Sequence, residues 1–142
     1  MNWSITNEDT VFLKSIERAS FSAKDFDHRA HLRLAYIYLV RYQDISQANK
    51  AVEKALIGLL RAAGVDPDAK YHQTLTTAWL MAVWHFMNNA GNTESADEFI
   101  DKNSKLLNSK IMLSHYTEKR LFSDESRRTF VAPDLEPIPV YN

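Results

Sequence analysis

Residues 24–42 decide the fold, with the sequence Lys-Asp-Phe-Asp-His-Arg-Ala-His-Leu-Arg-Leu-Ala-Tyr-Ile-Tyr-Leu-Val-Arg-Tyr. One set of side chains recurs with the spacing of a single helix face: His28, His31, Leu32, Ala35, Tyr36 and Leu39. Further apolar residues widen that face until only Arg29, Arg33 and Arg41 clearly require water. We therefore expect a helix from about residue 24 to 42 that lies centrally and contacts several neighbours.

The rest of the chain is also typical of helix. Only three glycines and four prolines occur in 142 residues, and helix-breaking residues are therefore scarce. The spacing and capping signals predict further helices over about 8–20, from Ser46 to about 63, over about 69–89, and from Ser95 to about 107. Thr6 or Asn7 is placed to cap the first of these helices, and Thr117 and Ser123 are each placed to cap a short helix. The predicted fold is all-α, an irregular up-and-down bundle of about five main helices.

The C-terminal segment, 131–142, differs from the rest. It contains three of the four prolines, so it cannot continue as a helix and should be extended. Leu135 and Ile138 give it apolar side chains to bury, so we expect it to dock on the helices. We predict one domain over residues 1–142, with 131–142 as its docked tail.

Composition excludes several classes of function. The formal net charge is −1, which does not provide the positive field that nucleic-acid binding requires. The chain has no cysteine, so disulfides and thiolate chemistry are excluded. Residues 1–9 lack the pattern of an export signal, and the longest apolar stretch, 78–87, is too short to span a membrane. We expect a cytoplasmic protein with no nucleic-acid or membrane partner.

Histidines are the main candidates for function. In an up-and-down bundle the first turns of helices 24–42 and 69–89 lie at the same end, which would bring His28, His31 and His72 together. A neutral imidazole near a helix N-terminus is a good ligand, and three of them with open positions are typical of a catalytic site for a divalent transition metal. The descending helix would return His115 to the same end.

Two other interpretations of these histidines stay open. They could form a metal-free pocket for a polar ligand or for acid–base chemistry, or a purely structural hydrogen-bond network. If the site is catalytic, with or without a metal, His72, His115, Tyr71 and Thr76 are the candidate catalytic residues. Gln73, Asp27 and Tyr116 are candidates for supporting groups or substrate contacts.

Three segments resemble a group of small bacterial all-helical proteins. They are Phe26-Asp-His-Arg-Ala-His-Leu32, Lys70-Tyr-His-Gln-Thr-Leu-Thr76 and the segment from Leu121 to Leu135. The resemblance covers most of the chain from Phe26 onward and implies no activity. It implies that the histidine-bearing turns and the C-terminal segment belong to one architecture. Those proteins often have Glu where this chain has Gln73, so a role for that carboxylate would be weakened here.

Two functional hypotheses follow. The first is a small-molecule enzyme or ligand-binding protein, with a histidine-rich and potentially metal-binding site at one end of the bundle. The alternative is a non-catalytic interaction or homodimerisation module whose histidines form a structural network.

Overall fold

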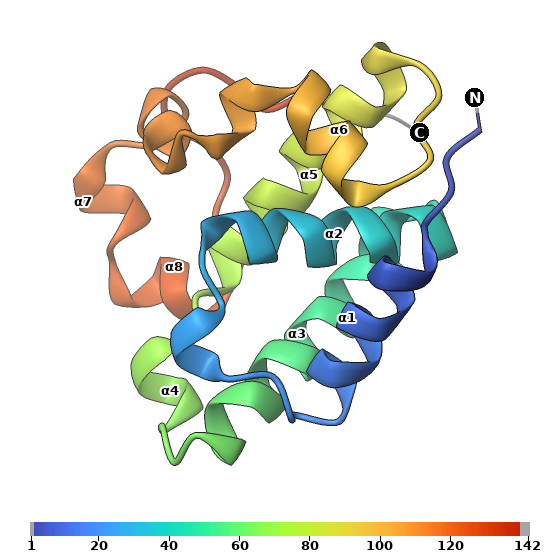
Figure 1. Ribbon diagram of the computed structural model, residues 1–142. Coiled ribbons are helices and arrows are strands. Elements are labelled where there is room, and N and C mark those ends of the chain that lie inside the picture. The colour runs from blue at the N-terminus through green and yellow to red at the C-terminus, as the bar shows by residue number, and fades with distance from the viewer. Residues whose placement is uncertain (1, 140–142) are drawn as a thin grey trace.

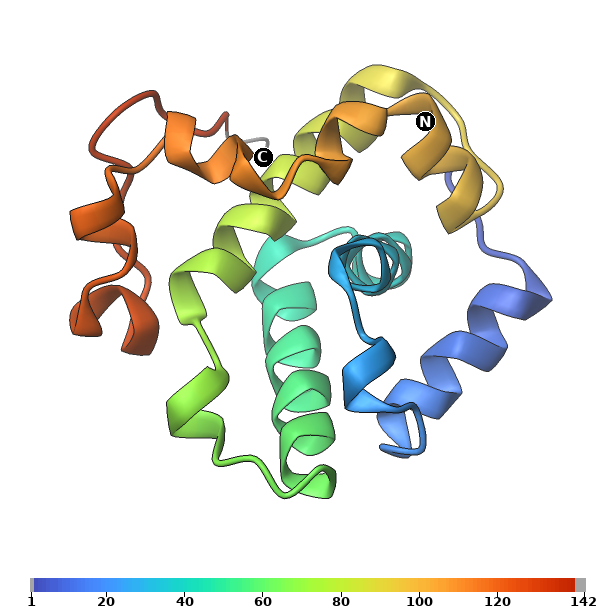
Figure 2. The same ribbon diagram turned by 60° about the vertical axis from the view of Figure 1, so that its left-hand side comes forward.

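The computed structural model describes residues 2–139, and within that range the chain folds into helices and turns around one central helix (Figures 1 and 2). That helix, α2 (His28–Tyr42), is seen almost end-on in Figure 2, with α1, α3, α5 and α6 around it. The helices are α1 (Asn7–Glu17), α2, α3 (Ile45–Ala62), α4 (Pro67–Lys70), α5 (Gln73–Ala90), α6 (Ala96–Lys102), α7 (Glu118–Leu121) and α8 (Asp124–Arg128). Short 3-10 turns cover Ala23–Asp25, Ser104–Leu107 and Ser109–Ser114. The all-α bundle is confirmed.

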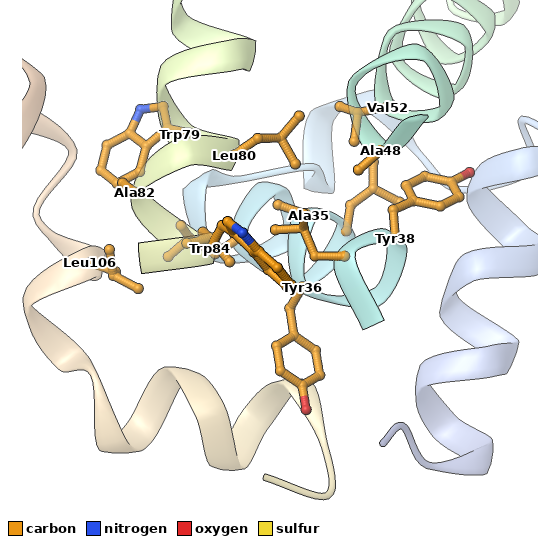
Figure 3. Packing of buried hydrophobic residues seen from close by; sticks show 14 of the residues in the cluster. Ala35, Tyr36, Tyr38, Ala48, Val52, Trp79, Leu80, Ala82, Trp84 and Leu106 are labelled. Atoms are coloured by element: carbon orange, nitrogen blue, oxygen red, sulfur yellow. The ribbon is translucent and has the colours of Figure 1, made fainter. Parts of the chain in front are cut away.

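The central position of α2 explains its unusually apolar sequence. Its residues 34–39 are all buried, because neighbours cover this helix on several sides. Tyr36 and Tyr38 extend from it in different directions (Figure 3). The Tyr36 ring stacks on Phe99 of α6 with centroids 5.0 Å apart, and its hydroxyl donates to the carbonyl of Ser4 at 2.9 Å. Buried tyrosines need such a partner for the hydroxyl, and here the bond secures the N-terminal segment.

Most helix starts that the sequence predicts are confirmed. Thr6, Ser95, Thr117 and Ser123 each accept a hydrogen bond from a backbone amide in the first turn of α1, α6, α7 and α8 respectively. Thr6 and Asp9 form a reciprocal capping box. After α3 the chain turns at Gly64, whose φ of +74° is in the region that favours glycine.

Four predicted helices have different limits. The α2 helix begins at His28 because the Asp27 carboxylate caps it, and Asp44, not Ser46, caps α3. The predicted helix 69–89 is two helices, α4 and α5, with His72 as the N-cap of α5. The predicted helix from Ser95 to 107 ends early at Asn103, whose side chain donates to the carbonyl of Phe99. In each case a polar side chain competes for backbone groups, which apolar periodicity does not reveal.

A buried carboxylate joins α1, α2 and α6. Asp9 is 1% exposed and accepts hydrogen bonds from Arg33 Nε at 3.0 Å and from the backbone amide of Ala96 at 3.0 Å. The Arg33 guanidinium also lies over the Phe12 ring, 4.5 Å from its centroid. Arg29 instead forms surface ion pairs with Asp97 and Asp101.

Residues 103–138, which we call the C-terminal region, consist of short helical turns and extended chain that pack beside α5 (Figure 1). The extended part is held by hydrogen bonds, including one from the buried Tyr116 hydroxyl to the carbonyl of Val131 at 2.7 Å. Thr74 of α5 contributes two more, accepting from the amide of Val131 and donating to the carbonyl of Thr129. Residues 140–142 of the predicted tail lie outside the described range.

Among the helices that the structure describes, each is too short or too polar to cross a membrane.

Candidate functional site

Both ring nitrogens of His72 are occupied by backbone partners. Nδ1 accepts from the amide of Leu75 at 3.1 Å, which caps α5. Nε2 donates to the carbonyl of Leu121 at 2.8 Å, which ties α5 to α7. Burial is the main factor that lowers the pKa of His72, and the nearby charge of Arg127 lowers it further. His72 is therefore neutral at pH 7, in the tautomer that serves both bonds.

The structure does not assemble the predicted metal-ligand set. His28 donates through Nε2 to the carbonyl of Leu106 at 2.8 Å, and its ring packs against Trp79 with centroids 4.5 Å apart. Trp79 follows His72 by seven residues, or about 10 Å along α5. His28 therefore lies about two helical turns along α5 and not at its first turn. Within residues 2–139, no three His, Asp, Glu or Cys side chains are grouped closely enough to hold a metal ion.

His31 remains close to His28 and is partly buried. Its ring lies beside Phe26, with centroids 6.0 Å apart. Burial, reinforced by the neighbouring His28, lowers the pKa of His31 to about 4. It is a neutral, partly buried residue of the first turn of α2.

His115 is engaged by the C-terminal region. Its Nδ1 donates to the carbonyl of Glu136 at 2.7 Å, while its own carbonyl accepts from the amide of Leu135. This pairing gives His115 a structural role at the end of a 3-10 turn.

The remaining candidates, Tyr71, Gln73 and Thr76, do come together at the break between α4 and α5. The Tyr71 hydroxyl donates to Gln73 Oε1 at 3.2 Å, and Thr76 donates to the carbonyl of His72 at 2.9 Å. Gln73 Nε2 in turn donates to Thr77 at 3.0 Å and to Asn49 of α3 at 3.3 Å. Burial, with a contribution from the charge of Glu53, raises the pKa of Tyr71 to about 12, so its hydroxyl stays protonated.

Tyr71 and Gln73 line a pocket of about 480 Å³ between α3, α4, α5 and α8. Its other lining residues are Glu53, Ile57, Pro67, Asp68, Asp124, Arg127 and Arg128. This volume is in the range of natural small-molecule sites. The sequence predicts two of these residues as site members and does not predict the charged ones, which come from distant segments.

Charges of both signs border this pocket without neutralising one another. Within residues 2–139, the carboxylates of Glu53 and Asp124 and the guanidinium of Arg128 form no ion pair. Arg127 uses one nitrogen to donate to the carbonyl of Asp68 at 3.1 Å. The site therefore combines neutral hydrogen-bonding groups with charged groups that are free to bind a ligand.

Comparison with known proteins identifies no matching family model, curated protein or solved structure.

Proposed function

We propose that this protein binds a small zwitterionic molecule, such as an α-amino acid or a short peptide, in the pocket between α3, α4, α5 and α8. The observation that carries the proposal is the presence of unpaired guanidinium and carboxylate groups around one pocket of suitable size. Two arginines and three carboxylates line it, so its charge is close to balanced. A polyanion or a polycation would meet repulsion from one of these sets, whereas a ligand with both charges satisfies both.

The expected contacts follow from the chemistry of each lining group. A ligand carboxylate pairs with the guanidinium of Arg128, since an arginine fork matches a carboxylate with two hydrogen bonds. Arg127 adds the donors that its bond to Asp68 leaves unused. A ligand ammonium pairs with Glu53, and Tyr71 and Gln73 offer neutral hydrogen bonds to the ligand body.

Binding without catalysis is the better-supported activity. A histidine that acts as a general base needs a free nitrogen lone pair, and the only lone pair of the neutral His72 ring accepts from the amide of Leu75. The Tyr71 pKa of about 12 makes this hydroxyl a hydrogen-bond donor at pH 7 and a poor base. The pocket therefore offers recognition groups, and neither His72 nor Tyr71 is available as a proton acceptor.

The test is isothermal titration calorimetry with matched ligands. The panel pairs free α-amino acids and dipeptides with analogues that lack either the amino group or the carboxylate. We expect some zwitterions to bind and both types of analogue to bind at least about tenfold more weakly, because each loses a charge-assisted hydrogen bond.

The matched variants are Arg128→Gln, which removes a pocket cation, and Arg18→Gln, which removes an exposed cation that does not line the pocket. We expect Arg128→Gln to weaken binding about tenfold or more and Arg18→Gln to leave it unchanged. Equal loss with both variants, or equally strong binding of analogues that lack the amino group, would contradict the proposal. So would a panel in which no zwitterion produces heat that saturates.

A further inference from the structure

A second and larger groove, with a volume of about 970 Å³, follows α3 and is bordered by Glu17 of α1 and by Tyr38 and Tyr42 of α2. Its lining residues on this helix extend from Gln47 to Arg61, which is about 21 Å of helix. The zwitterion pocket is half as large and adjoins this groove, since Glu53 and Ile57 line both. A groove of this length exceeds what one small metabolite covers and matches a peptide segment of about four helical turns.

The floor of the groove is apolar and is formed largely by small residues. Ala51, Ala55 and Gly58 present small side chains or none along α3, and Tyr42 of α2 lies beside them. A Cβ atom added to Gly58 meets nothing within 4 Å beyond the adjacent helix backbone, so the space above this residue is open. Small residues allow a second helix to approach closely, because the distance between packed helices depends on the side chains at the contact.

The rim of the groove has uncompensated positive charge. Lys50, Lys54 and Arg61 are exposed along α3, and within residues 2–139 none of them forms an ion pair. The acidic group on the opposite side, Glu17, accepts a hydrogen bond from the Tyr38 hydroxyl at 2.9 Å and pairs with Arg41 at 3.7 Å. The one other carboxylate along the groove is that of Glu53, which also faces the smaller pocket.

From this length, floor and charge we infer that the α3 groove docks an acidic amphipathic helix from a partner protein. Apolar residues at every third or fourth position of that helix cover Tyr42 and the small residues of α3. Its flanking Glu and Asp residues pair with Lys50, Lys54 and Arg61. Charge complementarity selects an acidic partner, and the opening above Gly58 accommodates its closest approach.

Fluorescence anisotropy with a labelled synthetic peptide tests this inference on the full chain. The probe is a 16-residue helical peptide with Leu on one face and Glu elsewhere. Its controls are a peptide of the same composition in scrambled order and a peptide with Lys in place of Glu. We expect the acidic amphipathic peptide to bind in the micromolar range, more weakly as salt rises, and both controls to bind at least tenfold more weakly.

Gly58→Leu is the decisive variant, because it fills the groove at a position with room for a side chain. Leucine is also a better helix former than glycine, so we expect this variant to melt at or above the temperature of the parent protein. Binding should fall at least tenfold. The matched control, Ala62→Leu, adds the same side chain to an exposed position of α3 outside the groove and should bind normally.

Charge reversal tests the rim separately. The double variant Lys50→Glu, Lys54→Glu should lose at least tenfold in affinity, while Lys105→Glu, Lys110→Glu, at exposed positions in the C-terminal region, should not.

Binding that survives Gly58→Leu, or that is equal for the scrambled peptide, would overturn the inference. Sedimentation that shows a dimer which Gly58→Leu dissociates would also overturn it, because the occupant would then be a second copy. Gly58 does not line the zwitterion pocket, so zwitterion binding should persist in Gly58→Leu.

Discussion

The helices around α2 and the C-terminal region are held together by different forces. Around α2, the stabilising feature is burial of large side chains, and within the described residues only one large exposed hydrophobic, Val11, belongs to these helices. The other large exposed hydrophobics lie in the C-terminal region: Leu107, Phe122, Phe130 and Leu135. That region buries fewer apolar side chains, and hydrogen bonds from side chains to backbone also hold it in place.

The difference explains what the histidines do in the fold. His28 and His72 lie on the helices of the first region, and each donates to a carbonyl of the second, at Leu106 and Leu121. A neutral imidazole suits this role because it can lie among apolar rings and still offer one N–H group. Histidines on an apolar helix face can therefore link two regions of a fold, without being a metal site.

The largest effect should come from the first region, with Asp9→Ala. This change leaves Arg33 and the amide of Ala96 without their buried acceptor, so we expect a loss of about 3–5 kcal/mol in the free energy of unfolding. Urea denaturation measures it. Asp101→Ala, which removes a carboxylate from an exposed ion pair, should cost less than about 1 kcal/mol. Similar losses in both variants would show that the buried carboxylate is not a centre of stability.

The next effect is a loss of stability in acid. Since the folded-state pKa of His31 is about 4 and that of an unfolded histidine is about 6.5, the unfolded chain binds more protons between these values. The contribution of His31 is therefore complete above pH 6.5 and is lost as the pH falls toward 4, up to about 3 kcal/mol. Denaturation at several pH values should show this slope, and His31→Leu should reduce it. An unchanged slope in His31→Leu would assign the effect to other groups.

A smaller effect should separate the two regions. His72→Ala removes the cap of α5 and the bond to Leu121, and we expect a loss of about 2 kcal/mol. His72→Asn keeps a capping side chain and should recover about half of that loss, without the bond to α7. Hydrogen exchange of amides in residues 118–128 should accelerate in both variants. Acceleration in His72→Ala alone would mean that the cap, and not the link to Leu121, holds the C-terminal region.

The smallest effect concerns Ser126 of α8. Its hydroxyl is buried and, among the residues that the structure describes, lacks a hydrogen-bond partner. Removing an unpaired buried hydroxyl is neutral or favourable, so Ser126→Ala should raise the free energy of unfolding by 0 to about 1 kcal/mol. Thermal denaturation can detect such a change. A clear decrease would reveal a partner for this hydroxyl.

Local signals predicted much of the fold. The caps at Thr6, Ser95, Thr117 and Ser123 depend on residues three positions apart, so the sequence alone identifies them. The break before α5 was not predicted, because histidine is not among the usual N-cap residues and the apolar spacing continues through it. The central position of α2 followed from the width of its apolar face.

The candidate site was harder to predict from the sequence than the fold. Tyr71 and Gln73 were identified because they flank His72, but Arg127 and Arg128 had the pattern of a solvated surface helix. They join Tyr71 only through the packing of α8 against α5. The partners of His28 and His72 are backbone carbonyls 78 and 49 residues away, and every residue type has such a carbonyl. No pattern of side chains in the sequence can therefore predict these contacts.

The way in which the extended C-terminal segment is held affects which of its residues can change. The bonds from Thr74, Tyr116 and Arg120 end on backbone atoms of Thr129, Val131 and Ala132, which any non-proline residue would supply. Asp134 is different, because its carboxylate accepts from both the amide and the hydroxyl of Thr117. Apart from this contact and its few buried apolar side chains, the segment can vary in sequence and keep its path. The side chains that specify this path belong mainly to residues outside the segment.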